Sequence, residues 1–214
     1  MKTYDYIIFD WDGTLAKTPK VLSDSYKEAL LKRGLLLTDE HYQKFMMGNW
    51  LNGLKNFGVP KAEKTLDEVM RIFSRRLSDV ELYDGVENIL GAFHKGGKKM
   101  ALVSTAPSEF LAKADVLRTI NRYIDAVITS DDVPDNKLNL FVLEKCLKRL
   151  KAKKSKTIYV GNTSKDAVIG REFGVATVIF YPKENEKFYD KNEIVSEKPD
   201  YVIREFEELL RIVK

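Results

Sequence analysis

The sequence predicts an α/β fold, a doubly wound parallel sheet with an all-helical cap domain inserted into it. From residue 84 onward, β-prone apolar runs alternate with helical patterns, and this order builds parallel sheets covered by helices on both faces. Residues 17–80 instead contain amphipathic helical patterns and no convincing strand. We therefore expect a core domain of residues 1–16 and 81–214 and a cap domain of residues 17–80.

The core elements follow one another in a regular order. An apolar, β-prone run over residues 4–8 predicts a buried first strand. Gly96 and Gly97 end the helix that follows the cap, and Gly174 ends a later helix. The predicted elements after the cap are a helix over 84–94, a strand over 99–104, a helix over 108–119, a short strand over 126–130, a helix over 138–151, a strand over 157–160, a helix over 165–173, a strand over 175–181, a polar connection over 182–198, a strand over 200–203 and a helix over 205–213.

The cap shows two clear helical patterns, over residues 24–33 and 66–77. Its turns are expected at Gly48, Gly53, Gly58 and Pro60.

Two features of the cap could reach a ligand. Arg71, Arg75 and Arg76 share one predicted helix, where a solvent-facing stripe is favoured over contact with a substrate anion. The bulky segment 45–50 could line an entrance, although packing in the cap core is the favoured interpretation.

Composition narrows the class of protein. The 214 residues suffice for a core domain and a smaller one, and 44% hydrophobic and 32% charged residues are typical of a soluble globular protein. Because no apolar run approaches the ~18 residues of a membrane helix, and the N-terminus lacks a secretory pattern, we expect no membrane partner. The single cysteine, Cys146, excludes an internal disulfide and suits the cytoplasm. The net charge of +4 is mild and the lysine-rich residues 148–154 lack interleaved aromatics, so no nucleic acid partner is expected.

Asp10 and Asp12 are the most informative residues of the chain. They come where the first strand ends, and Gly13 and Thr14 turn the chain immediately afterwards. Side chains two apart along a strand point to the same side, so the two carboxylates can converge at the carboxyl end of the sheet, where such folds bind ligands. Two acids this close need a cation or a shared proton to relieve their repulsion.

The other strands bring further polar groups to the same edge. Ser104 and Thr105 precede a helix, an arrangement that suits a phosphate oxygen. Lys137 precedes the helix after the third strand, and Asn162 and Asp166 follow the fourth strand. Together these groups predict a site for a divalent cation and a phosphoryl group. Oxygen-rich ligands favour Mg²⁺, and an aspartate can attack phosphorus while a second carboxylate transfers the proton.

With these motifs in this order, nearly the whole chain resembles the haloacid dehalogenase (HAD) superfamily, specifically its phosphoglycolate phosphatase-like branch with a helical cap between the first two motifs. The resemblance implies a HAD-like, Rossmann-like core. Residues 10–14 resemble the first motif, which implies that Asp10 is the nucleophile and that Asp12 is the acid/base and a metal ligand through its backbone carbonyl. Ser104 resembles the phosphate-binding hydroxyl of the second motif, and Lys137 resembles the lysine of the third.

Three positions depart from the family pattern. Thr105 stands where many relatives have asparagine, and Lys137 is followed by leucine rather than proline. In the fourth motif, Gly-Asp-x-x-x-Asp in the family, Asn162 replaces the first acid. An amide oxygen can bind a hard cation but adds no charge, so a weaker Mg²⁺ site is expected. The implied metal-binding residues are Asp10, Asp12, Asn162 and Asp166.

We expect a cytoplasmic enzyme that uses Mg²⁺ to hydrolyse a small phosphorylated metabolite through an aspartyl-phosphate on Asp10. Two alternatives stay open: a phosphotransferase of the sugar-phosphate mutase kind, and a phosphate-binding or regulatory protein whose catalysis Asn162 has weakened. A dehalogenase is disfavoured because those relatives lack an acid at the position of Asp12. The sequence predicts neither the substrate nor the oligomeric state.

Overall fold

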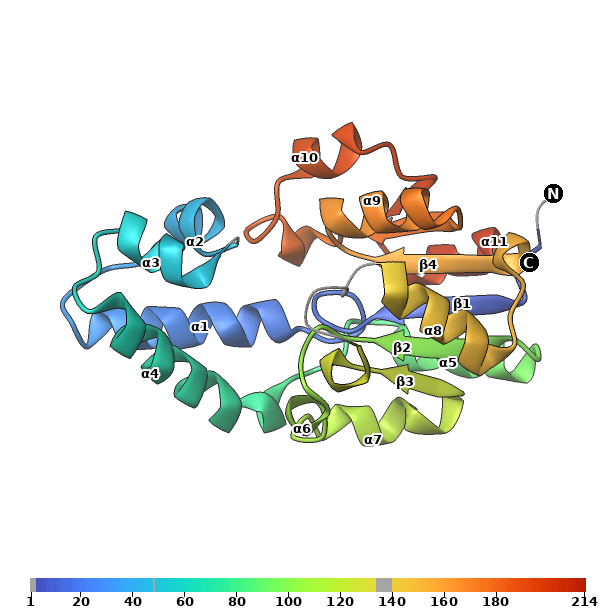
Figure 1. Ribbon diagram of the computed structural model, residues 1–214, viewed down its shortest axis with the longest axis horizontal. Coiled ribbons are helices and arrows are strands. Elements are labelled where there is room, and N and C mark those ends of the chain that lie inside the picture. The colour runs from blue at the N-terminus through green and yellow to red at the C-terminus, as the bar shows by residue number, and fades with distance from the viewer. Residues whose placement is uncertain (1–2, 48, 134–139) are drawn as a thin grey trace.

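The computed structural model describes residues 3–47, 49–133 and 140–214, which form a parallel sheet with helices on both faces and a helical arm at one end (Figure 1). The strands are β1 (Tyr6–Asp10), β2 (Lys99–Val103), β3 (Ala126–Ile128), β4 (Thr157–Gly161), β5 (Ala176–Phe180) and β6 (Tyr201–Ile203). The α-helices are α1 (Thr18–Leu31), α2 (Asp39–Met46), α3 (Trp50–Asn56), α4 (Ala62–Arg75), α5 (Val86–Lys95), α6 (Ser108–Leu111), α7 (Val116–Ile120), α8 (Leu140–Leu150), α9 (Ser164–Phe173), α10 (Lys191–Ser196) and α11 (Leu209–Ile212). None of the described helices combines the length and apolar character that a membrane span requires.

The sheet has the strand order β3-β2-β1-β4-β5-β6, and every neighbouring pair is parallel. The predicted α/β, doubly wound fold is thereby confirmed. The chain order reverses at β1, which has β2 on one side and β4 on the other. Because Asp10 pairs with Val103 and Phe9 with Val160, the carboxyl ends of these three strands reach the same edge. Doubly wound sheets bind their ligands at such a reversal.

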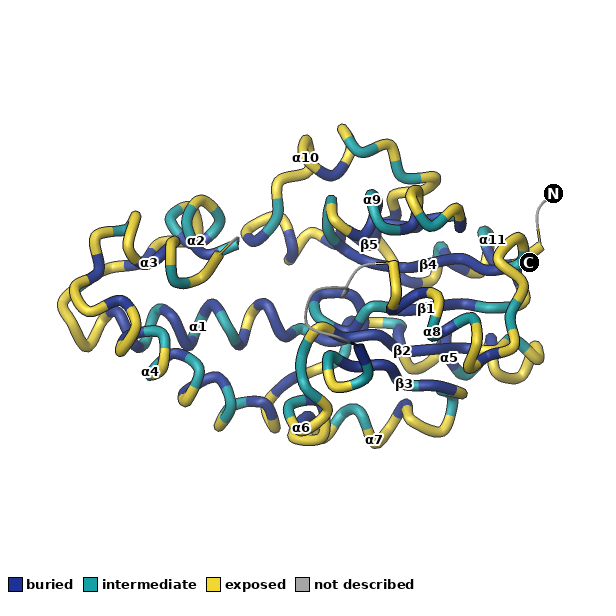
Figure 2. Tube along the Cα trace, viewed as in Figure 1, coloured by how far each residue is buried: buried dark blue, intermediate teal, exposed yellow. Residues whose placement is uncertain are grey.

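Successive residues of β1 pack on opposite faces of the sheet. Ile7 and Phe9 belong to the larger core cluster, which includes residues of α5, α7 and α11, whereas Ile8 packs with residues of α8 and α9. Figure 2 shows the buried strands between these helical layers. Cys146 is free and buried in the second cluster, where burial raises the pKa of its thiol to about 12.

Helices α1 to α4, which we call the insertion, lie between β1 and β2 in the chain and form the arm in Figure 1. They have a hydrophobic cluster of their own, which includes Tyr26 and Leu54. The two chain segments that lead into and out of the insertion lie side by side, because Ala16 and Leu82 form an antiparallel bridge and the backbone N–H of Lys17 donates to the carbonyl of Glu81 at 2.8 Å. The insertion is thus held close to the carboxyl ends of the strands.

The predicted turn at Gly53 is wrong, because Gly53 lies inside α3. A Cβ at this position would lie 1.9 Å from the carbonyl oxygen of Phe45, so glycine is what permits close packing of α3 against the end of α2. The chain does turn at Gly58 and Pro60, and Gly48 lies outside the described residues.

Two further local predictions are wrong. The single helix expected over 108–119 is divided into α6 and α7. The apolar spacing continues across the break, so periodicity does not detect it. The polar connection expected over 182–198 contains a 3₁₀ turn at Lys183–Asn185 and helix α10, and it buries Asn185 and Phe188 completely or nearly so.

Candidate active site

The loop after β1 holds both acids of the first motif in a tight turn. The backbone N–H of Gly13 donates to the carbonyl of Ala16 at 2.9 Å, and the N–H of Ala16 donates to the carbonyl of Trp11 at 3.0 Å. Gly13 has a φ of +85°, and a Cβ on it would lie 2.2 Å from Nδ2 of Asn162. Glycine is therefore required at this position for both its backbone conformation and its contact with the fourth motif.

Asp10 is the last residue of β1. Asp10 and Asn162 of the fourth motif both lie within hydrogen-bond distance of the Thr14 hydroxyl. Oγ1 of Thr14 lies 3.1 Å from Oδ2 of Asp10 and 3.3 Å from Oδ1 of Asn162. Burial raises the pKa of Asp10 well above its ordinary value, and the nearby carboxylates of Asp166 and Asp12 raise it further. Asp10 thus sits in a partly buried pocket of concentrated negative charge.

Asp12 faces the end of β2. The Ser104 hydroxyl donates to Oδ2 of Asp12 at 3.1 Å, and Oγ of Ser104 accepts from the backbone N–H of Ala106 at 3.0 Å. Burial raises the pKa of Asp12, although the hydrogen bonds from Thr18 and Ser104 oppose that shift. Ser104, predicted from its position before a helix, is therefore in direct contact with Asp12.

Asp166 organises the loop of the fourth motif. Its Oδ2 accepts from Oγ1 of Thr163 at 2.6 Å and from the backbone N–H groups of Thr163 and Asn162 at 2.9 and 3.2 Å. Its Oδ1 accepts from the Tyr159 hydroxyl at 2.6 Å. Thr163 and Asp166 form the capping box at the start of α9. Four donors thus occupy the oxygens of Asp166, while its charge still acts on Asp10.

The oxygen atoms at this edge suit Mg²⁺. Oδ2 of Asp10 and Oδ1 of Asn162 approach the same hydroxyl, while the amide of Asn162 also interacts with the Tyr189 hydroxyl. Within the described ranges, no group of three or more His, Cys, Asp or Glu residues is arranged to hold a metal ion. Mg²⁺ is usually bound by only one or two carboxylates together with waters and substrate phosphate, so Asp10, Asp12 and the Asn162 amide form a donor set of the right chemistry.

Two cavities adjoin the acids. Asp10 lines a small one of about 70 Å³, together with Ser104, Thr105 and Asp166. Asp12 lines a larger one of about 470 Å³ between the insertion and the core, and Thr105 borders both. Lys137, the remaining predicted phosphate-binding residue, lies outside the described residues.

Residues that the sequence did not single out complete the site. Asn185 is fully buried, and its Nδ2 donates to the carbonyl of Gly13 at 3.0 Å. The hydroxyl of Tyr189 lies within 3.0 Å of the place where a Gly13 Cβ would be, next to the amide of Asn162. Both residues come from the segment after β5. Its polar composition does not indicate that any of its residues lie at the site. Thr14 belongs to the first motif, and its placement after Asp12 could have indicated a supporting role.

A family model of haloacid dehalogenase-like hydrolases matches residues 7–180. The chain belongs to this family. The resemblance drawn from its motifs is thereby confirmed, and the chain is a phosphohydrolase of this family.

Several HAD-family relatives match nearly the full chain. It is 32% identical to the pyrophosphatase PpaX of Halalkalibacterium halodurans, over 97% of this chain and 95% of that protein. It is 27% identical to the phosphoglycolate phosphatase of Vibrio parahaemolyticus, again over 97% of this chain and 95% of that protein. Among solved structures, a HAD family hydrolase of Deinococcus radiodurans, with bound phosphate and sodium, has a TM-score of 0.84 at 16% identity over 98% of this chain and 94% of that one. This last likeness concerns the fold alone.

Proposed function

We propose that this protein is a Mg²⁺-dependent hydrolase of a small phosphomonoester that reacts through an aspartyl-phosphate on Asp10. One observation carries the proposal. The carboxyl ends of β1, β2 and β4 bring Asp10, Asp12, Ser104 and Asn162 to one edge of the sheet, beside a cavity, in a chain of the HAD family.

Each residue has a distinct task in the proposed reaction. A carboxylate oxygen of Asp10 attacks phosphorus, and the oxygen of the leaving group takes a proton from Asp12 as its bond to phosphorus breaks. Asp12 then accepts a proton from the water that attacks the phosphoryl group and releases Asp10 with inorganic phosphate. The position of Asp12 in the larger cavity supports this division, because the leaving group would occupy that side.

Ser104, Thr105 and Lys137 are proposed to hold the phosphoryl oxygens. Mg²⁺ is proposed to bind Asp10, the backbone carbonyl of Asp12 and the Asn162 amide oxygen, with Asp166 supporting the loop. When bound, the cation would offset the negative charge of the phosphoryl group during transfer.

Phosphate release from a panel of small phosphate esters, measured with and without Mg²⁺, tests this proposal. The panel includes pyrophosphate and 2-phosphoglycolate, for which the two relatives are named. We expect release to depend on Mg²⁺, and we expect Asp10→Asn to lower kcat by about 10³-fold or more, as the loss of a nucleophile does.

Asp67→Asn is the matched control, because Asp67 is exposed on α4 and the substitution makes the same chemical change away from the site. Full activity of Asp10→Asn would overturn the assignment of the nucleophile. A mutase would instead convert its substrate to an isomer with little free phosphate.

A further inference from the structure

The larger cavity has walls from both parts of the molecule. Pro19 and Leu22 come from α1, Met70 and Phe73 from α4, and Phe110 from α6 in the core. Its volume of about 470 Å³ lies in the range of roughly 300–1,000 Å³ that small-molecule sites usually have. It opens directly onto Asp12, so a group attached to the phosphoryl oxygen would enter it.

The described lining of this cavity is mostly apolar, and its polar groups include the carboxylate of Asp12 and the hydroxyls of Thr18, Thr105, Tyr42 and Tyr189. Met47 and Trp50 belong to the bulky segment 45–50, for which the sequence favoured packing in the cap core, and both contribute to the walls of this cavity. The remaining described lining residues are aliphatic, aromatic, proline or methionine.

Positive charge is missing from this lining. Among the described residues that line the cavity there is no lysine, arginine or histidine, and the single charged group, Asp12, is acidic. A leaving group with its own carboxylate or second phosphate would therefore be desolvated without a counter-charge and beside a like charge.

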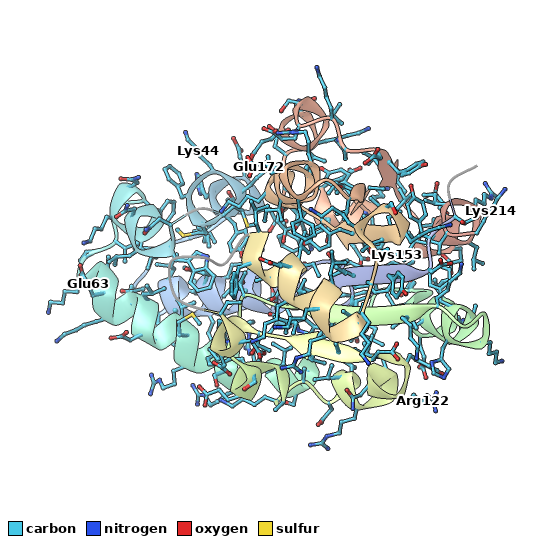
Figure 3. The ribbon with its side chains drawn as sticks, turned by 45° about the vertical axis from the view of Figure 1, so that its right-hand side comes forward. Lys44, Glu63, Arg122, Lys153, Glu172 and Lys214 are labelled. Atoms are coloured by element: carbon cyan, nitrogen blue, oxygen red, sulfur yellow. The ribbon has the colours of Figure 1, made fainter. Side chains whose placement is uncertain are left out.

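Two arginines of this region form ion pairs with residues that do not line the cavity. Arg33 pairs with Glu68 at 2.8 Å, and Arg76 pairs with Glu28 at 2.6 Å. Lys44, labelled in Figure 3, is exposed and points away from the body of the molecule. The cationic contact considered for the arginines of α4 is absent from the described lining.

The hydroxyl of Thr18 serves the acid that is already present. Thr18 is only 3% exposed, and a side-chain hydrogen bond from it to Asp12 opposes the rise in the pKa of that carboxyl group. A hydroxyl carries no charge, so Thr18 offers no counter-charge to an anionic leaving group.

From this lining we infer that the substrate is a phosphate monoester of an uncharged, largely apolar alcohol, aromatic or branched aliphatic. This inference rests on the proposed function and names the substrate class of the same site. It sets the chain apart from enzymes that act on pyrophosphate or 2-phosphoglycolate, whose leaving groups are anionic.

Benzyl phosphate and 2-phosphoglycolate form a suitable pair of probes, because both release an alkoxide oxygen and differ mainly in the apolar or anionic group beside it. We expect kcat/KM for benzyl phosphate to exceed that for 2-phosphoglycolate and for pyrophosphate by about tenfold or more, the range that apolar pocket contacts provide. A preference for either anionic substrate would overturn the inference and leave the proposed function intact.

Leu22→Lys adds a cation to the cavity wall. It should lower kcat/KM for benzyl phosphate about tenfold and raise it for 2-phosphoglycolate, so that the ratio of the two changes most. Leu31→Lys is the matched control, since Leu31 lies on the same helix and is 66% exposed.

If Leu22→Lys does not fold, Trp50→Ala serves in its place, because Trp50 is already 39% exposed. Trp50→Ala should raise KM for benzyl phosphate and leave KM for methyl phosphate unchanged, and an unchanged ratio between those two esters would count against the inference.

The affinities of unreactive analogues test this inference independently of the proposed hydrolysis. Benzylphosphonate and phosphonoacetate are unreactive analogues of the two probes, and calorimetry with the unmodified protein measures their affinities without turnover. Tighter binding of benzylphosphonate supports the apolar site even if no ester is hydrolysed. Tighter binding of phosphonoacetate would overturn it, whatever the activity.

Discussion

At the scale of single residues, Asn185 connects the active-site loop to the rest of the core. Its Nδ2 donates to the carbonyl of Gly13 at 3.0 Å, and its Oδ1 accepts from the Tyr83 hydroxyl at 2.5 Å. The side chain is fully buried, so neither partner has water as a substitute. Asn185 therefore fixes the backbone between Asp12 and Thr14.

Replacing Asn185 by alanine leaves two buried polar groups without partners. We expect Asn185→Ala to lower the free energy of unfolding by about 1–3 kcal/mol, the usual cost of such groups, and to reduce kcat because the acids lose a fixed position. Urea unfolding and phosphate release measure the two effects. Asn192→Ala is the control, because Asn192 is exposed on α10. If Asn185→Ala matches the wild type in both measurements, Asn185 does not hold the loop.

At the scale of secondary-structure elements, the sequence predicts the sheet well because its signals are local. Buried strands carry continuous apolar runs, and Gly174 ends α9 with a φ of +79°, as a helix-terminating glycine does. Asp10, Asp12, Ser104 and Asn162 were found by the same reasoning, since each stands where a strand ends.

What could not be predicted depends on partners distant in sequence. Phe188 and Tyr189 are isolated apolar residues in a polar segment, so no periodicity marks them as buried. Phe188 nevertheless packs in the hydrophobic cluster of the insertion, with its ring centroid 5.9 Å from that of Tyr42. Gly53 suggested a turn because only the contact with Phe45 explains its place inside a helix.

Phe188 gives the insertion a further attachment to the core, which a truncation can test. Phe188→Ala should lower the free energy of unfolding by about 3–5 kcal/mol, the range for a buried phenylalanine. Amide hydrogen exchange in α2 should become faster, because Tyr42 loses its packing partner. Denaturant unfolding and exchange followed by mass spectrometry measure these effects. Phe141→Ala, at a residue 39% exposed on α8, should change stability by less than about 1 kcal/mol. Equal effects of the two substitutions would contradict the attachment.

At the scale of the whole molecule, several attachments hold the insertion over the carboxyl ends of the strands. They include the two segments joined by the Ala16–Leu82 bridge, and Phe188 with its neighbour Tyr189. The apolar cavity and the acidic edge therefore share one boundary, at Asp12. In the proposed reaction, the charged groups at the sheet edge carry out catalysis and the apolar cavity under the insertion selects the substrate.

The balance of charge at the sheet edge links metal binding to global stability. Asn162→Asp adds a carboxylate to the three already near one another, those of Asp10, Asp12 and Asp166, so the metal-free variant should unfold at a lower temperature than the wild type because like charges repel. Mg²⁺ relieves that repulsion and binds more tightly to a site with more charge. A ligand stabilises the folded state by RT ln(1 + [L]/Kd), so each tenfold gain in affinity should add about 1.4 kcal/mol at saturating Mg²⁺.

Thermal unfolding with and without Mg²⁺ should therefore show a larger rise in Tm for Asn162→Asp than for the wild type. Asn192→Asp, an exposed control, should show no such difference. If Mg²⁺ raises Tm equally in all three proteins, the amide of Asn162 does not lie at the metal site.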